Sequence, residues 1–387
     1  MTIKIMYLVD QYQGPQAGTE GQLLQLLLHL DRSRYEPSLT LLRDTEYSRR
    51  NAFPCPVRVL GITKLASLRA IIGMFRYAFM LRRENYRLVH CFFNDSALIA
   101  PFFLWLFGIR VLVSRRDMGF WYTPGNLVVL RVVARFVDRY VANSQAVKRL
   151  VHEQERVRSE KITVIYNGYA PAREDNSEAA AIPLLTQVAP RAPVVGIVAN
   201  LRPIKRIDTL VDAFALVAKT HPDARLVIVG DTASQQAEST LDQLQNMVAG
   251  LGLHDRVIFT GRVEAARPYI ERFSVAVLCS ESEGLSNSII EYMQAGRAIV
   301  CTDTGGNPEL VRDGHNGFLV CVGDSHALAE RLLRLLSDPA LAQRFGEAGY
   351  EAVRTYTHAR MVTGQMTCYD DVLAARLRHR TTDPSIS

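Results

Sequence analysis

The chain has 387 residues, of which 48% are hydrophobic and 22% charged, and its formal net charge is +6. This length exceeds one ordinary hydrophobic core and predicts a globular protein of two domains. The basic excess favours anionic surroundings such as phosphate substrates or acidic lipid. Nucleic acid is not expected as a partner, because the Lys and Arg residues are dispersed and no nucleic-acid-binding module appears.

The six cysteines are widely spaced and form no C-x-x-C pair, which is typical of a reducing compartment and not of a disulfide frame or zinc site. Residues 2–9 lack the layout of a signal peptide and predict a first strand. The most apolar stretch, residues 97–109, is only 13 residues long and contains Pro101 and Gly108, which is too short for a membrane-spanning helix. These features predict a cytoplasmic chain.

Strands and helices alternate along the first half of the chain. A Gly-bearing loop at 14–21 and an amphipathic helix to about Leu30 follow the first strand. His90 lies inside an apolar run, and we expect a buried core histidine there. Near-continuous apolar strands alternating with helices indicate a parallel sheet covered on both faces. The expected strands are residues 3–9, 38–42, 57–60, 88–92, 110–114, 139–142 and 162–165.

A change of composition divides the chain into two α/β halves. Residues 171–193 contain four prolines, an acidic piece and an Ala-rich piece, and predict a linker. We therefore expect Rossmann-like domains at residues 1–170 and 194–357, followed by a helix and polar tail at 358–387. The strands expected in the second domain are residues 194–199, 225–229, 256–259, 275–279 and 298–301.

The most specific chemistry lies in residues 282–309, SEGLSNSIIEYMQAGRAIVCTDTGGNPE. The polar run 286–288 predicts a helix start, where unpaired N–H groups and the helix dipole favour an anion such as phosphate. Glu283 precedes this helix and Glu291 lies about one turn inside it. Carboxylates accept hydrogen bonds from hydroxyl groups, so the pattern suits a ligand with phosphates and hydroxyls, such as a sugar nucleotide.

The rest of this segment predicts a second loop at the same sheet edge. Gly296 suits a left-handed helix stop, and Gly305-Gly306 lets the backbone approach another group closely. Asn307 is expected to be the N-cap of a further helix, with Pro308 at its first position.

Two glutamates separated by seven residues, then Gly296, a strand, Gly305-Gly306 and Glu309, resemble the signature of retaining glycosyltransferases of the GT-B fold, in particular glycosyltransferase family 4. The resemblance implies two Rossmann-like, doubly wound parallel-sheet domains facing across a cleft, with the last helix crossing back to the N-terminal domain. It implies that Glu283 contacts the donor sugar and Glu291 the ribose. The donor diphosphate would be held by the amides of Gly284, Leu285, Ser286 and Asn287.

Residues 199–205, ANLRPIK, resemble the basic segment with which this family neutralises the donor diphosphate. Lys205 matches the family lysine. The usual arginine position is Asn200 here, so we predict Arg202 as the substitute. Fixed cations would stabilise the charge that develops on the leaving group. The resemblance implies that no metal or other cofactor is needed.

Further residues are assigned from the same resemblance. Gly18 and Thr19, in the loop after the first strand, are expected to face the donor diphosphate, and Arg262 to lie where relatives bind the base. Many relatives carry a His near the sugar after a strand of the first domain. This chain has SRRDMGFWY at 114–122 without a His, and Asp117 or Arg116 is the candidate for contacting the donor sugar or the acceptor hydroxyl.

Several of these features have simpler explanations. Ser288-x-x-Glu291 also fits a capping box that only ties down the helix start. Glu283 and Lys205 are alternatively ordinary solvated side chains, and Gly305-Gly306 a simple turn.

A basic and apolar helix near residues 64–83 suggests a second kind of partner. The resemblance implies peripheral contact with an anionic membrane, because family members with lipid-linked acceptors often dock such a surface on the bilayer. An amphipathic helix packed on the sheet explains the pattern as well. Its cations are Lys64, Arg69, Arg76, Arg82 and Arg83.

The predicted function is retaining, metal-independent transfer of a sugar from a nucleotide diphosphate donor to a hydroxyl of a glycan or lipid-linked acceptor. A UDP-sugar is the favoured donor. A GT-B sugar-nucleotide epimerase and a non-catalytic nucleotide-sugar-binding protein are the alternatives.

Overall fold

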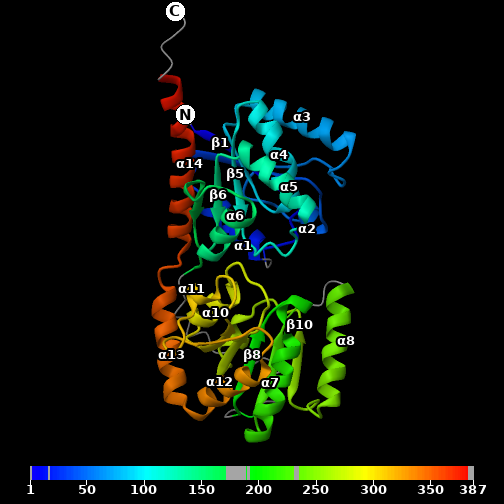
Figure 1. Cartoon of the computed structure of the whole chain (residues 1–387), viewed down its shortest axis with the longest axis vertical. Coiled ribbons are helices and arrows are strands. Elements are labelled where there is room, and N and C mark those ends of the chain that lie inside the picture. The colour runs from blue at the N-terminus through cyan, green and yellow to red at the C-terminus, as the bar shows by residue number, and fades with distance from the viewer. Residues whose placement is uncertain (1, 16–17, 171–188, 190–191, 231–234, 382–387) are drawn as a thin grey trace, which may run out of the picture. The chain divides into compact units, whose positions relative to one another are not determined.

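A computed structural model describes residues 2–15, 18–170, 189, 192–230 and 235–381. The chain divides into two compact units, one of Met1–Tyr169 with Tyr356–Ser387 and the other of Ala170–Thr355 (Figure 1). Most of the predicted linker 171–193 and the end of the tail, 382–387, lie outside the described residues.

Unit 1 is built on a sheet of seven parallel strands in the order β3-β2-β1-β4-β5-β6-β7. Its strands are β1 (Ile3–Val9), β2 (Tyr35–Leu41), β3 (Val57–Val59), β4 (Leu88–Cys91), β5 (Arg110–Arg115), β6 (Arg139–Ala142) and β7 (Ile162–Val164). Its helices are α1 (Gly18–His29), α2 (Glu46–Arg50), α3 (Leu68–Arg83), α4 (Asn94–Leu106), α5 (Pro124–Val133), α6 (Gln145–Gln154) and α14 (His358–Thr381), with the short turns η1 (Ala134–Phe136) and η2 (Ser159–Lys161).

Both faces of this sheet are buried, as the apolar strands predict. Along β1, Met6 and Leu8 belong to one apolar cluster, whereas Ile5, Tyr7 and Val9 belong to the cluster on the other face. This alternation follows from the two-residue period of a strand.

His90 is a core residue, as expected. It is fully buried, its Nδ1 lies 2.9 Å from the hydroxyl of Tyr369 on α14, and its Nε2 lies 2.9 Å from Ser114 Oγ. Burial lowers the pKa of His90 to about 3. The histidine therefore stays neutral and helps to attach α14 to the sheet.

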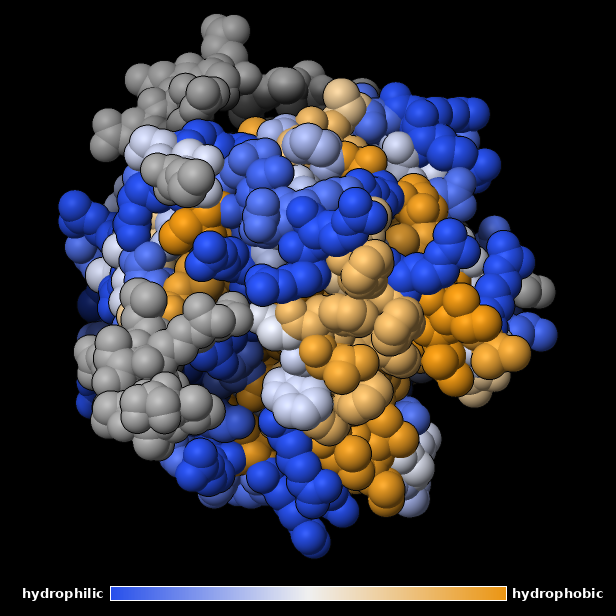
Figure 2. Space-filling view, turned by 90° about the horizontal axis from the view of Figure 1, so that it is seen from above, coloured by the Kyte–Doolittle hydropathy of each residue, from blue (hydrophilic) through white to orange (hydrophobic). Residues whose placement is uncertain are grey.

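Helix α3 has apolar residues on two faces. Ala70, Met74, Tyr77, Ala78 and Leu81 are buried. Leu68, Ile71, Ile72, Phe75 and Phe79 remain exposed. The packing expected from the sequence therefore accounts for only one of the two apolar faces of α3. Figure 2, a view from above relative to Figure 1, shows hydrophobic side chains gathered on the surface of the molecule.

Unit 2 contains a second all-parallel sheet, of six strands in the order β10-β9-β8-β11-β12-β13. Its strands are β8 (Val194–Val198), β9 (Arg225–Val229), β10 (Val257–Gly261), β11 (Val275–Leu278), β12 (Ala298–Thr302) and β13 (Phe318–Val320). Its helical elements are η4 (Pro203–Lys205), α7 (Ile207–Thr220), α8 (Gln235–Gly250), α9 (Arg267–Ile270), α10 (Asn287–Gln294), α11 (Asn307–Leu310), α12 (Ser325–Ser337) and α13 (Pro339–Val353).

The strand order of each sheet runs outward in both directions from its first strand. The direction changes between β1 and β4 in unit 1 and between β8 and β11 in unit 2. Ligands of open α/β sheets bind outside the carboxyl ends of the strands at such a switch point. The loops after β8 and β11 are therefore the first place to look for a site in unit 2.

Across the described part of the chain, every helix is too short or too polar to span a membrane.

Candidate active site

The segment after β11 folds as a loop followed by α10. The N-cap of α10 is not the residue that the capping-box alternative requires. Ser286 is the N-cap, and its Oγ accepts a hydrogen bond from the Ile289 N–H at 3.3 Å. Ser288 instead donates to the carbonyl of Val198 at 2.8 Å. The capping box between Ser288 and Glu291 is therefore wrong, because the helix starts too early for Glu291 to reach the cap.

Helix α10 ends at the residue that the sequence predicts, whereas the N-cap of α11 differs from the prediction. Gly296 has a φ of +63°, which is the left-handed stop that the sequence predicts. The N-cap of α11 is Gly306 and not Asn307. Asn307 is the first residue of α11. Its side-chain amide does not cap the helix, because it donates to the Thr302 carbonyl at 3.0 Å and holds the loop against β12.

Three consecutive backbone N–H groups before α10 have no hydrogen-bond acceptor among the described residues. Gly284, Leu285 and Ser286 are buried, yet no acceptor in the described part of the chain bonds to their N–H groups. Buried backbone donors without partners are rare in proteins, because each loses its hydrogen bonds to water. These groups are therefore available to an anionic ligand.

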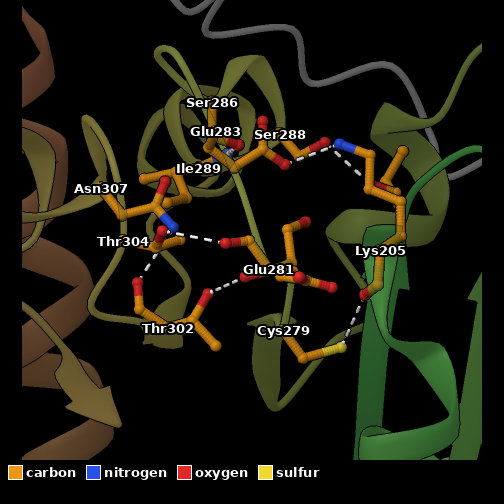
Figure 3. A network of polar contacts seen from close by, with 12 residues as sticks. Lys205, Cys279, Glu281, Glu283, Ser286, Ser288, Ile289, Thr302, Thr304 and Asn307 are labelled. Atoms are coloured by element: carbon orange, nitrogen blue, oxygen red, sulfur yellow. Dashed lines mark hydrogen bonds and ion pairs between the residues drawn. The ribbon is translucent and has the colours of Figure 1, made fainter. Parts of the chain in front are cut away.

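Lys205 and Glu283 come together at the switch point of unit 2. Lys205 Nζ lies 2.6 Å from Glu283 Oε1, and the two side chains are 23% and 12% exposed (Figure 3). Lys205 ends η4, which follows β8, and Glu283 follows the neighbouring strand β11. A solvated, unpaired state is thus excluded for both residues.

Backbone contacts tie the three loops of this edge together. The Glu281 N–H donates to the Ile204 carbonyl at 2.8 Å, and the Gly306 N–H donates to the Glu283 carbonyl at 3.1 Å. The hydroxyl of Thr304 donates to the Glu281 carbonyl at 3.0 Å (Figure 3). The loops after β8, β11 and β12 are therefore held as one unit around Lys205 and Glu283.

Cys279 supports the backbone of the lysine itself. Its Sγ lies 3.2 Å from the Lys205 carbonyl (Figure 3). The same sulfur lies 3.1 Å from the Arg206 carbonyl. Burial raises the pKa of the Cys279 thiol to about 12, so the thiol keeps its proton and donates. Arg206 adopts a left-handed φ of +49°, which is uncommon outside glycine and turns the chain into α7 directly after Lys205.

Glu291 is a second, separate carboxylate. None of the described residues donates a hydrogen bond to its side chain or forms an ion pair with it. Desolvation by burial raises the pKa of Glu291 from 4.5 to about 7. An unpartnered acceptor of this kind is free to bind hydroxyl groups of a ligand.

The raised pKa of Glu291 predicts a pH effect on stability. The folded protein binds the Glu291 proton up to about pH 7, whereas an unfolded glutamate releases it near 4.5. The contribution of this group is therefore fully present below pH 4.5 and is lost as the pH rises through 7, by at most about 3 kcal/mol. We expect Glu291→Gln to remove this fall from urea unfolding measured between pH 5 and 7.5. An identical pH slope in the variant would contradict the prediction.

Two arginines, Arg202 and Arg262, are also predicted for the site of unit 2. Arg202 is exposed and precedes η4, and its carbonyl accepts from the Lys205 N–H at 2.9 Å. Arg262 is exposed and follows β10, after Gly261 at a positive φ. Their roles stay predictions.

In unit 1, Gly18 and Thr19 form the first turn of α1 after β1. The nearby Gly21 is required by packing, since a Cβ there would lie 2.5 Å from the Pro15 carbonyl oxygen. Burial raises the pKa of Glu20 in the same turn. The loop therefore has a structural role and also carries a buried acid, and the donor contacts expected of Gly18 and Thr19 stay predictions.

The Asp117 carboxylate accepts hydrogen bonds from residues of its own loop. Its carboxylate accepts from the Gly119 N–H at 2.7 Å and from Trp121 Nε1 at 3.1 Å. These contacts hold the loop after β5, and a role for Asp117 at the sugar stays a prediction.

Arg116 belongs to a polar cluster at the carboxyl ends of the unit 1 strands. Its guanidinium donates to Asn167 Oδ1, and its carbonyl accepts from Asn143 Nδ2 at 3.2 Å. Burial lowers the pKa of Arg116 to about 10, while the nearby Glu20 opposes the shift. Sequence reasoning assigned no role to Glu20, Asn143 or Asn167, although both asparagines lie within three residues after an apolar strand.

Solved structures resemble the whole chain. HepE of Anabaena, in complex with UDP, has a TM-score of 0.83, with 95% of this chain and 100% of that chain covered at 23% identity. Sucrose-phosphate synthase of Thermosynechococcus elongatus has a TM-score of 0.80, with 96% and 100% covered at 20% identity. At these identities the likeness shows the fold alone, and that fold is GT-B.

Sequence comparison then identifies the family. Residues 17–173 match the model described as Glycosyltransferase Family 4, and residues 192–338 match the model described as Glycosyl transferases group 1. The chain belongs to the family 4 glycosyltransferases of GT-B fold, as the motif at 282–309 predicts.

Individual relatives match over shorter stretches. N-acetyl-alpha-D-glucosaminyl L-malate synthase of Bacillus anthracis is 31% identical over 177 residues, which are 46% of this chain and 45% of that protein. Putative glycosyltransferase EpsD of Bacillus subtilis is 33% identical over 171 residues, 44% of this chain and 43% of that protein. The chain thus spans less than half the length of these curated relatives.

Proposed function

We propose that this protein transfers a sugar from a nucleotide diphosphate donor to a hydroxyl group in the synthesis of a glycan or glycolipid. The observation that carries the proposal is the 2.6 Å contact between Lys205 and Glu283 at the switch point of unit 2, next to unused N–H groups. A cation and free amides complement a diphosphate, and a carboxylate complements sugar hydroxyls. Membership of the glycosyltransferase family supports the same activity.

The charges suggest how these groups act. In the structure, Glu283 neutralises Lys205. A bound diphosphate would share that cation and accept from the N–H groups of Gly284 to Ser286. Negative charge grows on the diphosphate as its bond to the sugar breaks, so these fixed groups bind the transition state more tightly than the donor. Glu283 would orient a sugar hydroxyl, and Glu291 would accept from the ribose.

The finer points of the proposal are a UDP-sugar donor, retention of the anomeric configuration and independence of metal ions. UDP is supported by a related structure, HepE of Anabaena, which is described in complex with UDP and glucose. Retention rests on the family resemblance. Metal independence is supported by Lys205 and the N–H groups of Gly284 to Ser286, because a shared ammonium and N–H dipoles would stabilise the charge of the diphosphate without a metal.

The acceptor is proposed to be a glycan or a lipid-linked hydroxyl compound. Relatives are named for different acceptors, among them L-malate, phosphatidyl-myo-inositol and the lipopolysaccharide core. The named compounds share hydroxyl groups and differ in the rest of their structure. We therefore propose only the chemical class of the acceptor, a hydroxyl compound.

Incubation of the purified chain with UDP-, GDP- and ADP-sugars, with and without EDTA, tests the proposal. We expect a UDP-sugar to raise the melting temperature, since it binds only the folded state. Slow release of UDP without an acceptor is expected in EDTA. Interconversion of the donor sugar would indicate an epimerase, and binding without turnover a non-catalytic binding protein. Activity lost in EDTA and restored by a divalent ion would contradict metal independence.

Glu291→Ala is expected to weaken UDP-sugar binding at pH 7.5 by roughly 10- to 100-fold, because hydrogen bonds to a charged group contribute about 1.5–3 kcal/mol. Titration calorimetry measures the affinity, and Glu330→Ala, an exposed glutamate on α12, is the matched control. If Glu291→Ala keeps the wild-type affinity, Glu291 is not a donor ligand.

A further inference from the structure

Two neighbouring arginines at the end of β5 have opposite surroundings. Arg115 is the last residue of the strand, and Arg116 follows it. Successive side chains of an extended chain point to opposite faces of the sheet. Arg115 accordingly lies over the ring of Tyr140, in the apolar cluster of one face, with the guanidinium carbon 5.9 Å from the ring centroid. Arg116 instead lies in the field of Glu20 on α1, a helix that covers the other face.

Only the first of these arginines has a counter-ion. Arg115 forms two hydrogen bonds with the Glu155 carboxylate, at 2.7 and 3.0 Å. Arg116 forms no ion pair with any carboxylate that the structure describes, and its guanidinium donates to the neutral amide oxygen of Asn167. A guanidinium that is partly removed from water is costly without an anion, because an amide does not offset its charge.

The pKa values of the two arginines shift in opposite directions. Burial alone would lower the pKa of Arg115, but Glu155 raises it above its ordinary value. Burial lowers the pKa of Arg116 to about 10. Arg116 is therefore charged at neutral pH in surroundings that disfavour its charge, and an anion supplied from outside would stabilise it.

The surroundings of Arg116 have the layout of a ligand site. Arg116, Asn143 and Asn167 follow β5, β6 and β7, and Glu20 lies at the start of α1, which follows β1. The Asn143 side chain donates to the Arg116 carbonyl at 3.2 Å, and its own buried Oδ1 has no partner in the part of the chain that is described. Ligands of open parallel sheets bind outside these carboxyl ends of the strands.

Glu20 does not occupy the guanidinium. It is 7% exposed, and its carboxylate accepts from the backbone N–H groups of Gln13 and of Glu20 itself. Arg116 is partly exposed, and within the described ranges only Asn167 accepts from its side chain. A guanidinium has five N–H donors in a planar fork, which matches the oxygens of a phosphate or a carboxylate.

The donor diphosphate does not require this cation. Unit 2 already offers Lys205 and the N–H groups before α10 to the diphosphate. A transfer reaction has a second substrate, and Arg116 belongs to the other unit.

We propose that Arg116 binds a phosphate or carboxylate group of the acceptor, so that the acceptor is a hydroxyl compound that also carries negative charge. This assignment rests on the proposed transfer reaction and narrows the acceptor class given there. It gives Arg116 a role in binding and specificity, and the hydroxyl that receives the sugar is a different group of the same molecule.

Titration of the full chain with inorganic phosphate and with acetate, in saturating UDP, tests the proposal by NMR. UDP fills the proposed diphosphate site of unit 2, so that a further effect of phosphate reports on another site. The arginine Nε–Hε signal that is missing from the spectrum of Arg116→Lys identifies Arg116. We expect this signal to shift saturably with phosphate or acetate and not with chloride at equal ionic strength. The anion that binds more tightly distinguishes a phosphate site from a carboxylate site.

Three variants separate binding from a structural role, with the melting temperature of the UDP complex as the readout. Phosphate is expected to raise this temperature in the wild type. Arg116→Gln should weaken phosphate binding at least tenfold, since hydrogen bonds to a charged group are lost. Glu20→Gln should strengthen it about twofold or more, because a nearby negative charge is removed. Arg149→Gln replaces an exposed arginine of α6 and should bind phosphate like the wild type. The melting temperature without phosphate shows whether each variant is folded.

Three results would overturn the proposal. The first is the absence of a saturable shift with both anions, and the second is equal phosphate binding by Arg116→Gln and Arg149→Gln. The third is loss of the phosphate effect on the Arg116 signal when UDP is added, which would make Arg116 part of the donor site. Failure of the proposed function looks different, because UDP itself would then not bind. The Arg116 signal titrated without UDP would still show whether the anion site exists.

Discussion

Replacing Lys205 by alanine is expected to lower kcat for sugar transfer about 100- to 1,000-fold, which is the usual effect of removing one fixed donor from a developing negative charge. The lysine is held by its 2.6 Å contact with Glu283 and by the backbone contacts of Cys279. The donor KM should rise less than kcat falls, because the charge on the diphosphate increases as the bond breaks.

Steady-state kinetics with a saturating acceptor measures this effect. Lys219→Ala, an exposed lysine at the end of α7, is the control and should keep wild-type activity. Thermal unfolding separates lost chemistry from lost folding. A Lys205→Ala variant that folds and keeps its kcat would remove the cation from the proposed reaction and, with it, the main support for a metal-independent site.

The largest effect on stability is expected for Glu155→Ala. Glu155 is fully buried and binds the 4% exposed Arg115 through two hydrogen bonds of 2.7 and 3.0 Å. Tyr122 donates a further hydrogen bond to the same carboxylate. Removal of the acid leaves a buried guanidinium without its counter-ion, and such losses reduce the free energy of unfolding by about 3–5 kcal/mol.

Urea unfolding of the variant measures this loss. Glu271→Ala breaks the surface pair with Arg267, in which both side chains are 44% exposed, and is expected to change the free energy of unfolding by about 1 kcal/mol or less. Combined replacement of Arg115 by methionine and Glu155 by leucine should recover much of the stability, because no charge then remains buried. Similar small losses for Glu155→Ala and Glu271→Ala would contradict the prediction.

The sequence predicts most strands of both sheets, because strands buried on two faces are near-continuous apolar runs between turns. It misses β13, a strand of only three residues at the edge of the second sheet. The predicted N-cap of α11 is wrong by one position because of a tertiary contact. Asn307 has the side chain of a good N-cap but uses it on the Thr302 carbonyl, and Gly306 takes the cap position instead.

In the candidate site, too, the sequence predicts individual residues but not the contacts between them. Lys205 and Glu283 are each visible in the sequence as a charged residue shortly after an apolar strand. Their contact joins positions 78 residues apart, and it follows from the pairing of β8 with β11. Arg116 and Asn167 are 51 residues apart and come together in the same way, at the carboxyl ends of the unit 1 strands.

The sequence by itself determined the two parallel-sheet units, the family and the residue types at the strand ends, because these depend on local order along the chain. Only the tertiary structure decided that Glu283 neutralises Lys205 and that Asp117 serves its own loop. It also decided which apolar face of α3 is buried. The sequence predicts an apolar, basic helix there, but only packing against the sheet selects the apolar side chains that become buried.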